Sequence, residues 1–337
     1  MNPAASPSPA LFFDTMTAYQ RTAALKAAIK LDLFTSIGET AATTAEIAER
    51  CQASPRGTRI LCDYLTIIGF LTKTEGRYAL TPDTAMFLSR KSPAFAGGTV
   101  DFLLSPGIVG AFDDLAAVVR KGGTVQGELG TTAPEHPEWL HFAKSMGPMM
   151  VPAAHGLAEL APLEAGKPSK VLDVAASHGM YGIAIAQRNP DAHLVALDWA
   201  PVLQIATENA RTAGLGNRFS TIAWSAFDVD LGSDYDLVLV PNFLHHFPEP
   251  ECVRFLRRVH SALRDGGRVA IVEFVPNPDR VSPPPSASFS LTMLATTPSG
   301  DAYTFAELSG MLDEAGFRPP TAHPLLMSPG TAVIAMK

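Results

Sequence analysis

The sequence predicts an α/β protein in two parts, with a doubly wound parallel sheet in the second half and a mainly helical module in the first. From residue 170 onward, short apolar runs alternate with helix-length segments, which is typical of a parallel sheet with helices on both faces. Two closing strand-like runs are separated only by a turn, so they predict a C-terminal antiparallel hairpin. Before residue 95, three helical segments precede two short strand-like runs, which indicates a winged-helix-like fold.

Composition narrows the functional classes. The 337 residues are enough for two domains. Hydrophobic residues make up 47% of the chain and charged residues 18%, a composition that argues against a disordered chain. The net charge of −7 argues against a general nucleic-acid binder. The three cysteines have no CxxC spacing, and no run of about 18 apolar residues occurs, so we expect neither a zinc site nor a membrane span. A cytoplasmic protein is therefore expected.

The first module carries clear helix-start signals. Thr43 with Glu46 three residues later forms a capping box, and Ser54 followed by Pro55 favours another start. Lys/Arg and Asp/Glu nearly balance in this module, and a neutral surface is a poor phosphate ligand, so packing or dimerisation is favoured over DNA binding. The expected elements are a helix over 25–34, helices beginning at 43 and 54, and strands at 70–74 and 78–81.

The second half predicts the alternating elements of the sheet. A turn at Ser328-Pro329-Gly330 joins the last two runs into the expected hairpin. The expected strands are 171–175, 193–197, 219–224, 235–240, 268–274, 322–327 and 332–336, and the expected helices are 178–188, 201–213, 249–263 and 304–315. The expected division is 11–95 for the winged-helix-like module, 96–165 for a helical connector and 166–337 for the sheet domain.

Small residues follow the first strand of the sheet, in the run Val171–Gly179. They allow a ligand close to the backbone, and the start of the next helix offers free N–H groups. Asp198 ends the following strand, where a carboxylate can accept both ribose hydroxyls of an adenosine. The glycines of a dinucleotide fingerprint are replaced by Ala175, Ser177 and Met180, which disfavours NAD. The pattern thus predicts an adenosine-containing cofactor.

With these motifs, the chain resembles the class I small-molecule O-methyltransferases that carry an N-terminal dimerisation domain, such as plant caffeic-acid-type and bacterial polyketide and hydroxyneurosporene enzymes. The similarity spans about Phe12 to Lys337 and is strongest in V-L-D-V-x-x-x-H-G, in Tyr235–Phe247 and in Leu263–Glu273. The resemblance implies a Rossmann-like methyltransferase sheet with S-adenosylmethionine as cofactor. It also implies a homodimer, a small hydroxylated aromatic or polyketide-like substrate in secondary metabolism, and a connector that contributes to the substrate pocket.

The resemblance also implies catalytic residues. The histidine of the family's L-H-D-W motif is the general base, a role that falls on His245, and the family's strand-end glutamate that holds this histidine matches Glu273. His246 stands where the family has aspartate. A second family carboxylate lies in a G-x-E-R-T context and matches Ala302, so the neighbouring Asp301 is the candidate substitute.

The remaining candidates concern cofactor and substrate binding. The family's adenine-contacting pair falls on Ala226-Phe227, and Trp199 can stack on the adenine or ribose. A methionine-rich helix over 142–150 matches the family's substrate-covering helix, and adaptable thioethers suit a varied aromatic guest. The cofactor candidates are Asp173, Ala175, Ser177, Gly179, Asp198, Trp199, Ala226, Phe227 and Asn242. The substrate candidates are Phe142, Met146, Met149 and His246.

Several alternatives stay open at this point. Departures from the family pattern at His246, Ala226 and Ala302 allow N- or C-methylation, or a family member whose cofactor is only structural. A cofactor-sensing winged-helix regulator and an NAD-dependent oxidoreductase are disfavoured by the neutral module and the missing glycines. Asp198 can instead cap the next helix, and Glu273 can be an exposed strand-end charge. The paired histidines lack an Asp/Asn cluster with matching spacing, so no metal site is expected.

Overall fold

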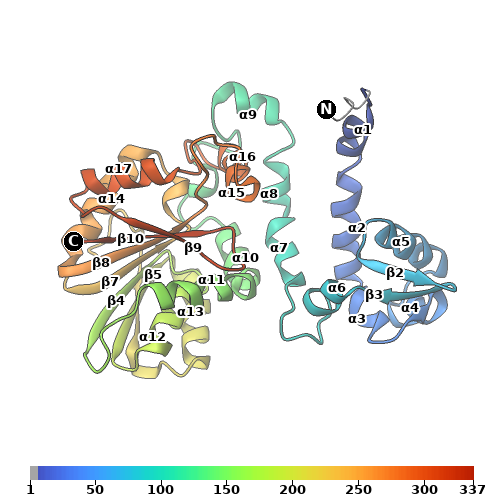
Figure 1. Ribbon diagram of the computed structural model, residues 1–337, viewed down its shortest axis with the longest axis horizontal. Coiled ribbons are helices and arrows are strands. Elements are labelled where there is room, and N and C mark those ends of the chain that lie inside the picture. The colour runs from blue at the N-terminus through green and yellow to red at the C-terminus, as the bar shows by residue number, and fades with distance from the viewer. Residues whose placement is uncertain (1–6) are drawn as a thin grey trace, which may run out of the picture. The chain divides into compact units, whose positions relative to one another are not determined.

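A computed structural model describes residues 7–337, which divide into two compact units (Figure 1). One unit ends at Val100, and the other runs from Asp101 to Lys337. Within the described residues, no helix combines the length and the apolar character that crossing a bilayer requires.

The first unit contains a three-stranded antiparallel sheet among short helices. The predicted hairpin is confirmed as β2 paired with β3, and a short third strand, β1, pairs with the other edge of β3. The elements are α1 (Ala10–Met16), α2 (Tyr19–Lys30), α3 (Leu33–Ile37), β1 (Ala42–Thr43), α4 (Thr44–Arg50), α5 (Pro55–Ile67), β2 (Leu71–Thr74), β3 (Arg77–Leu80) and α6 (Pro82–Phe87).

The helix starts predicted at Thr43 and Ser54 are confirmed by their hydrogen bonds. The Thr43 side chain accepts the N–H of Glu46, whose carboxylate in turn accepts the N–H of Thr43. Ser54 likewise caps the first turn of α5. The single helix expected over 25–34 is wrong, because Asp32 has a φ of 50°. A left-handed residue cannot continue a right-handed helix, so α2 and α3 are separate.

The second unit is built on a seven-stranded sheet in the order β6-β5-β4-β7-β8-β10-β9. The first five of these strands are parallel, and β10 runs antiparallel to both β8 and β9, as the predicted hairpin requires. The strands are β4 (Ser169–Val174), β5 (Ala192–Asp198), β6 (Phe219–Ala223), β7 (Tyr235–Pro241), β8 (Leu263–Glu273), β9 (Thr321–Pro324) and β10 (Thr331–Met336). The covering helices are α12 (Met180–Arg188), α13 (Ala200–Thr212), α14 (Glu249–Ala262) and α17 (Phe305–Glu314).

Helices cover both faces of this sheet, as the alternating sequence pattern predicts (Figure 1). Successive residues of a strand point to opposite faces. Leu172 and Val238 therefore pack with α14 and α17, whereas Val171 and Leu237 pack with α12 and with α11 (Gly147–Leu160) of the connector. The central strands are apolar on both sides, which explains why they are continuous apolar runs in the sequence.

The connector forms short helices that precede the sheet. The helix expected over 142–150 is divided at Met146, because Pro148 lacks an N–H donor and favours the first turn of a new helix. The elements are α7 (Val100–Leu103), α8 (Pro106–Gly110), α9 (Leu115–Lys121), the 3-10 turn η2 (Gly130–Thr132), α10 (Glu138–Ser145) and α11 (Gly147–Leu160). After β8 come α15 (Pro284–Ala287) and α16 (Phe289–Thr296).

Hydrogen bonds fix the connector against the end of α16. The N–H of Thr124 donates to the carbonyl of Thr297 at 2.8 Å, and the Thr131 hydroxyl donates to the carbonyl of Thr296 at 3.1 Å. A Cβ on Gly130 would collide with that same carbonyl of Thr296, so the approach requires glycine. These contacts join two segments that lie far apart in the sequence.

Gly182, in the first turn of α12, tests how tightly this helix packs on the sheet. A Cβ there would lie 2.6 Å from Leu194 Cδ1 and 2.8 Å from Asp173 Oδ2. We expect Gly182→Ala to lower the free energy of unfolding by about 1–3 kcal/mol through overpacking. The control is Gly310→Ala in α17, where nothing lies within 4 Å of the added Cβ and helix propensity should raise stability by about 0.5–1 kcal/mol. Urea denaturation measures both, and equal effects would contradict this packing.

Candidate active site

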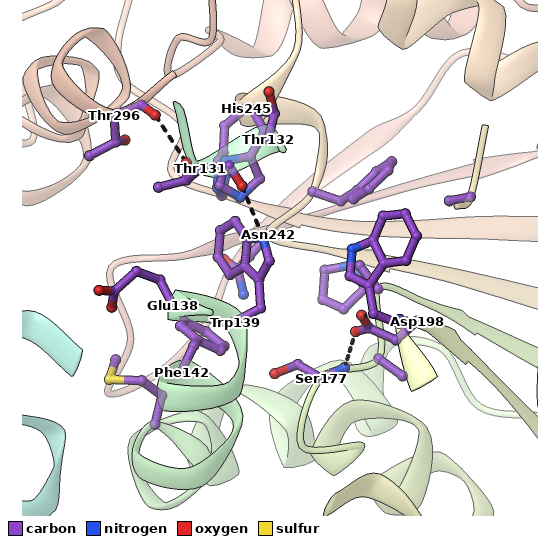
Figure 2. Close-up of a pocket in the computed structure, with 18 of the residues that line it drawn as sticks. Thr131, Thr132, Glu138, Trp139, Phe142, Ser177, Asp198, Asn242, His245 and Thr296 are labelled. Atoms are coloured by element: carbon purple, nitrogen blue, oxygen red, sulfur yellow. Dashed lines mark hydrogen bonds between the residues drawn. The ribbon is translucent and has the colours of Figure 1, made fainter. Parts of the chain in front are cut away.

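The second unit contains a cavity of about 870 Å³ at the carboxyl edge of its parallel strands. This is the edge at which ligands bind in doubly wound sheets. Three parts of the unit line the cavity: the turns after β4, β5, β6 and β7, the connector between Phe102 and Met150, and the segment from Phe274 through α16. Figure 2 shows side chains from all three parts.

A polar turn forms one end of the cavity. Ala175 and Ser177 follow β4 with φ values of 50° and 53°, so the backbone turns sharply there. The Ser177 N–H donates to Asp198 Oδ2 at 2.8 Å (Figure 2). The Trp199 N–H donates to Asp198 Oδ1 at 2.7 Å. Burial raises the pKa of the Asp198 carboxyl to about 6, although these two backbone hydrogen bonds oppose the shift. Asp198 does not cap α13, whose N-cap is Trp199.

This end fits an adenosine-containing cofactor. The Asp198 carboxylate has lone pairs left for ribose hydroxyls, because each oxygen receives only one of the two backbone hydrogen bonds. Trp199 and Trp224 bring indole rings to the lining. The Ser177 hydroxyl oxygen is buried and has no partner among the described residues, so it can bond a ligand.

Two predicted cofactor residues do not line the cavity. Asp173 is fully buried beneath the turn, where it accepts the N–H of Gly182 at 3.0 Å, and burial raises its pKa to about 8. Gly179 is the N-cap of α12 with a φ of 76°. Asp173 and Gly179 therefore support the conformation of the turn without lining the cavity, whereas Ala175 and Ser177 line it.

The next predicted pair of cofactor residues, Ala226 and Phe227, does line the cavity, as does Asn242 after β7. The ring of Phe227 packs with Phe243, with ring centroids 5.8 Å apart. Asn242 has a φ of 51°, and its N–H donates to the carbonyl of Val272 at 2.8 Å. These contacts give the turn after β7 a defined conformation.

A buried histidine and glutamate meet at the ends of β7 and β8. His245 lies in the 3-10 turn η4 (Leu244–His246), and Glu273 is the last residue of β8. Glu273 Oε2 is 2.5 Å from His245 Nδ1, and Glu273 Oε1 accepts the backbone N–H groups of Phe243, Leu244 and His245. Because β7 and β8 are parallel neighbours, their carboxyl ends meet, and the two side chains come together. Glu273 itself is 1% exposed, so it is not an exposed strand-end charge.

His246 extends this arrangement. Its Nε2 is 3.1 Å from His245 Nε2, and its Nδ1 is shielded from solvent with no partner among the described residues. A carboxylate accepts, so His245 Nδ1 donates to Glu273. In the neutral form of His245 that a general base needs, Nε2 would be the acceptor and His246 Nε2–H the donor. Burial, together with the neighbouring His245, holds the pKa of His246 well below its usual value, so this ring is neutral.

The structure does not bring Asp301 to the cavity. Its side chain is 42% exposed, and its Oδ2 is 3.3 Å from Nη1 of Arg280. Ala302, which matches the family carboxylate, is fully buried and carries no polar group. His245 therefore has Glu273 as its carboxylate partner.

The opposite end of the cavity is mainly apolar and includes the predicted Phe142, Met146 and Met149. Figure 2 shows Phe142 and Glu138 on one side of Trp139 and Asp198 on the other. The Trp139 indole N–H donates to the carbonyl of Thr131 at 2.9 Å, which fixes the ring. The sequence singles out none of the following lining residues as an individual candidate: Thr131, Thr132, Glu138, Trp139, Phe289 and Thr296. No motif marks them, because they come together only through the contact between the connector and α16.

His178 was also missed, although it lies in the motif after β4. Its ring stacks on Phe142 with centroids 5.9 Å apart, and its Nδ1 accepts the N–H of Met180 at 3.2 Å. Burial lowers its pKa to about 4, so the ring is neutral. The His178-Gly179 pair of the motif after β4 was the feature of the sequence that could have identified His178. Among residues 7–337, no cluster of three or more His, Cys, Asp or Glu side chains is arranged to hold a metal ion.

Comparison with known proteins is consistent with this geometry. The chain matches a model of the O-methyltransferase dimerisation domain over residues 13–90 and a model of the O-methyltransferase domain over residues 151–318. A crystal structure from Nostoc punctiforme, provisionally described as an O-methyltransferase, is 52% identical, with a TM-score of 0.95 over 99% of this chain and 100% of that one.

Two more distant proteins extend the comparison. The 3-hydroxy-5-methyl-1-naphthoate 3-O-methyltransferase of Streptomyces sahachiroi is 28% identical over 91% of this chain and 89% of its own length. Human N-acetylserotonin methyltransferase, solved in complex with S-adenosylmethionine, shares the fold, with 21% identity and a TM-score of 0.83 over 99% of both chains.

These findings confirm the predicted fold class and favour methyl transfer over an NAD-dependent oxidoreductase or a cofactor-sensing regulator. Three independent findings point to the same family: the sheet with its closing hairpin, the turn that can hold an adenosine, and the match to both domain models. The chain belongs to the family of S-adenosylmethionine-dependent O-methyltransferases that carry a dimerisation domain.

Proposed function

We propose that this protein methylates a hydroxyl of a small aromatic or polyketide-like molecule, with His245 as the general base. The buried contact between His245 Nδ1 and Glu273 Oε2 carries this proposal. His245 lines the same cavity as Asp198, so a proton acceptor and a nucleoside site share one enclosed space. The aromatic and methionine side chains at the other end suit a flat apolar acceptor.

The cofactor residues follow from the polar turn. S-adenosylmethionine, when bound, supplies an electrophilic methyl group on a sulfonium. Asp198 would accept the ribose hydroxyls, and the Ser177 hydroxyl would bond a second polar group of the cofactor. Trp199 and Trp224 would flank the adenine, and Ala175 would allow close approach to the backbone.

The acceptor needs a base because its hydroxyl must lose a proton. A phenol has a pKa of about 10 and histidine of about 6.5, so full prior deprotonation would cost roughly 5 kcal/mol. His245 Nε2 would therefore take the proton as the new bond to oxygen forms, a contribution of about 10²–10⁴-fold in rate. Glu273 is the positioning residue: it fixes the tautomer of His245 and stabilises the imidazolium that results.

His246 would hold the base before the acceptor arrives. Its Nε2–H donates to His245 Nε2 at 3.1 Å, so the lone pair of the base is occupied in the free protein. The acceptor hydroxyl would replace this hydrogen bond at His245 Nε2. The ring of Trp139 lies against His246, with centroids 5.0 Å apart, and would limit where the displaced imidazole can move.

The proposal extends to domains and partners. We propose that the segment 96–165 acts as a connector that contributes to the substrate pocket, that 11–95 dimerises and that 166–337 binds the cofactor. The match to a dimerisation-domain model and the exposed apolar side chains of the first helices support a homodimer. The near-neutral first module supports partners other than nucleic acid. The three free cysteines support a cytoplasmic setting, where thiols stay reduced.

The general-base assignment is tested by His245→Ala. We expect kcat for methyl transfer to fall by about 10²–10⁴-fold, because the acceptor would keep its proton. The dissociation constant of S-adenosylhomocysteine should stay within about twofold, since Asp198 and Ser177 are untouched. Transfer from radiolabelled S-adenosylmethionine to a hydroxynaphthalene measures the rate, and calorimetry measures the affinity.

The matched control for this test is His155→Ala, which removes an exposed imidazole from α11 outside the cavity. It should keep the wild-type rate. A His245→Ala variant with wild-type turnover would remove His245 from the mechanism.

Cofactor affinity should depend on pH through Asp198. The ionised carboxylate accepts both ribose hydroxyls, and protonation as the pH falls through about 6 turns one oxygen into a donor and removes the charge that strengthens both hydrogen bonds. The dissociation constant of S-adenosylhomocysteine should therefore rise below pH 6, towards about tenfold per pH unit. Asp198→Asn should weaken binding by about tenfold or more and flatten this profile, whereas Asp191→Asn on the surface should preserve it. Calorimetry between pH 5 and 8 decides, and a flat wild-type profile would contradict the ribose contact.

We expect the exposed aromatic side chains of α1 to stabilise the dimer. Phe12 and Phe13 are each 61% exposed in α1, and a neighbouring subunit would cover them. We expect light scattering to give a dimer for the wild type and a weaker dimer or a monomer for a variant with Phe12→Glu and Phe13→Glu. A monomeric wild type at micromolar concentration would be evidence against this assembly.

A further inference from the structure

A buried carboxylate lies at the acceptor end of the cavity, where most lining side chains are apolar. Glu138 is 6% exposed, and it lines the cavity together with Phe142 and Met149. Figure 2 shows it on the far side of Trp139 from Asp198. The general base, the cofactor turn and the motifs in the sequence leave Glu138 without a role. A charge buried among apolar groups is costly unless a partner compensates it.

The contacts of Glu138 orient the carboxylate. The hydroxyl of Ser105, itself the N-cap of α8, donates to Glu138 Oε2 at 2.8 Å, and Nδ1 of the half-exposed His141 lies 3.6 Å from the same oxygen. Oε1 lies against Gly107, where any Cβ would collide with it, so the chain leaves room for the carboxylate at this point. Glu138 also occupies the first turn of α10, where a negative charge is favoured. A carboxylate has about four lone-pair sites, so a donor in the cavity can still bond it.

The charges around the cavity are of one sign. Its described lining contains the carboxylates of Glu135, Glu138, Asp198 and Asp228 and has no lysine or arginine. An acceptor that carries its own carboxylate would meet no lysine or arginine among the described lining residues and would lie near Glu138. A hydroxyl or amino group facing Glu138 would instead gain a hydrogen bond to a charged acceptor, which is stronger than one to a neutral group.

We propose that Glu138 selects the acceptor: the substrate is a hydroxylated aromatic molecule that carries a second hydroxyl or amino group at its far end, and acceptors with a carboxylate there are excluded. This inference rests on the proposed function. Glu138 binds the acceptor at a distance from the methylated oxygen and takes no part in the proton transfer.

Four naphthalenes that differ at one position test this selection. The probes are 1-naphthol, 1,5-dihydroxynaphthalene, 5-amino-1-naphthol and 5-hydroxy-1-naphthoate. Calorimetry measures their binding to the protein loaded with S-adenosylhomocysteine, and methyl transfer measures kcat/KM. For the wild type we expect the hydroxyl and amino probes to exceed 1-naphthol by about tenfold or more, and the carboxylate probe to be the poorest.

The variant Glu138→Gln keeps an acceptor for the Ser105 hydroxyl but removes the charge. It should reduce the preference for the hydroxyl and amino probes by about tenfold, mainly through KM, and improve the carboxylate probe. Its affinity for S-adenosylhomocysteine should be unchanged. The matched control is Glu128→Gln, an exposed side chain of the connector outside the cavity, which should keep the wild-type order.

Three results would overturn the selection: a wild type that binds the carboxylate probe best, a wild type that binds none of the four, or a Glu138→Gln variant that weakens all four equally. The wild-type order tests the proposal even if the variant does not fold. Binding in the expected order without any methyl transfer would leave the selection standing and refute the proposed function. Transfer without any preference among the probes would refute the selection alone.

Discussion

The carboxylate of Glu273 determines the geometry of the reacting side of the cavity. It accepts three backbone N–H groups of the turn after β7 and contacts His245 Nδ1 at 2.5 Å. A carboxylate 1% exposed tolerates its burial only when such donors surround it. The conformation of the turn and the direction of the imidazole are therefore set together. The register of β7 with β8 is what brings the two residues to one place.

The cavity combines two environments in one enclosure. At one end, Asp198 and the backbone around Ser177 offer hydrogen bonds, and at the other, aromatic and methionine side chains surround Glu138. Trp139, held by its hydrogen bond to Thr131, lies between them (Figure 2). These two environments would suit the proposed transfer from a charged donor to a flat acceptor, with His245 as the base.

Some features of the site could be predicted because they are local. A small-residue turn after a strand, and an acidic residue at the end of the next, are read from short stretches of sequence, and the parallel sheet brings them to one edge. Asp301 is next in sequence to Ala302, the position of the family carboxylate, but this did not place its side chain in the cavity. Its carboxylate pairs with Arg280 at the surface instead. Glu138 and Thr131 carried no signal, since their place depends on how the connector packs against α16.

The sequence by itself determined the alternation of strands and helices in the sheet domain, the closing hairpin, the caps at Thr43 and Ser54 and the residues that follow each parallel strand. These depend on periodicity, turn chemistry and capping, which act over a few residues. Only the tertiary structure decided that α2 and α3 separate at Asp32, that His246 Nε2 lies 3.1 Å from His245 Nε2, and that the connector lines the apolar end of the cavity. The reason is physical: contacts between distant segments depend on how all the side chains fill the space together, and no short stretch of the chain contains that information.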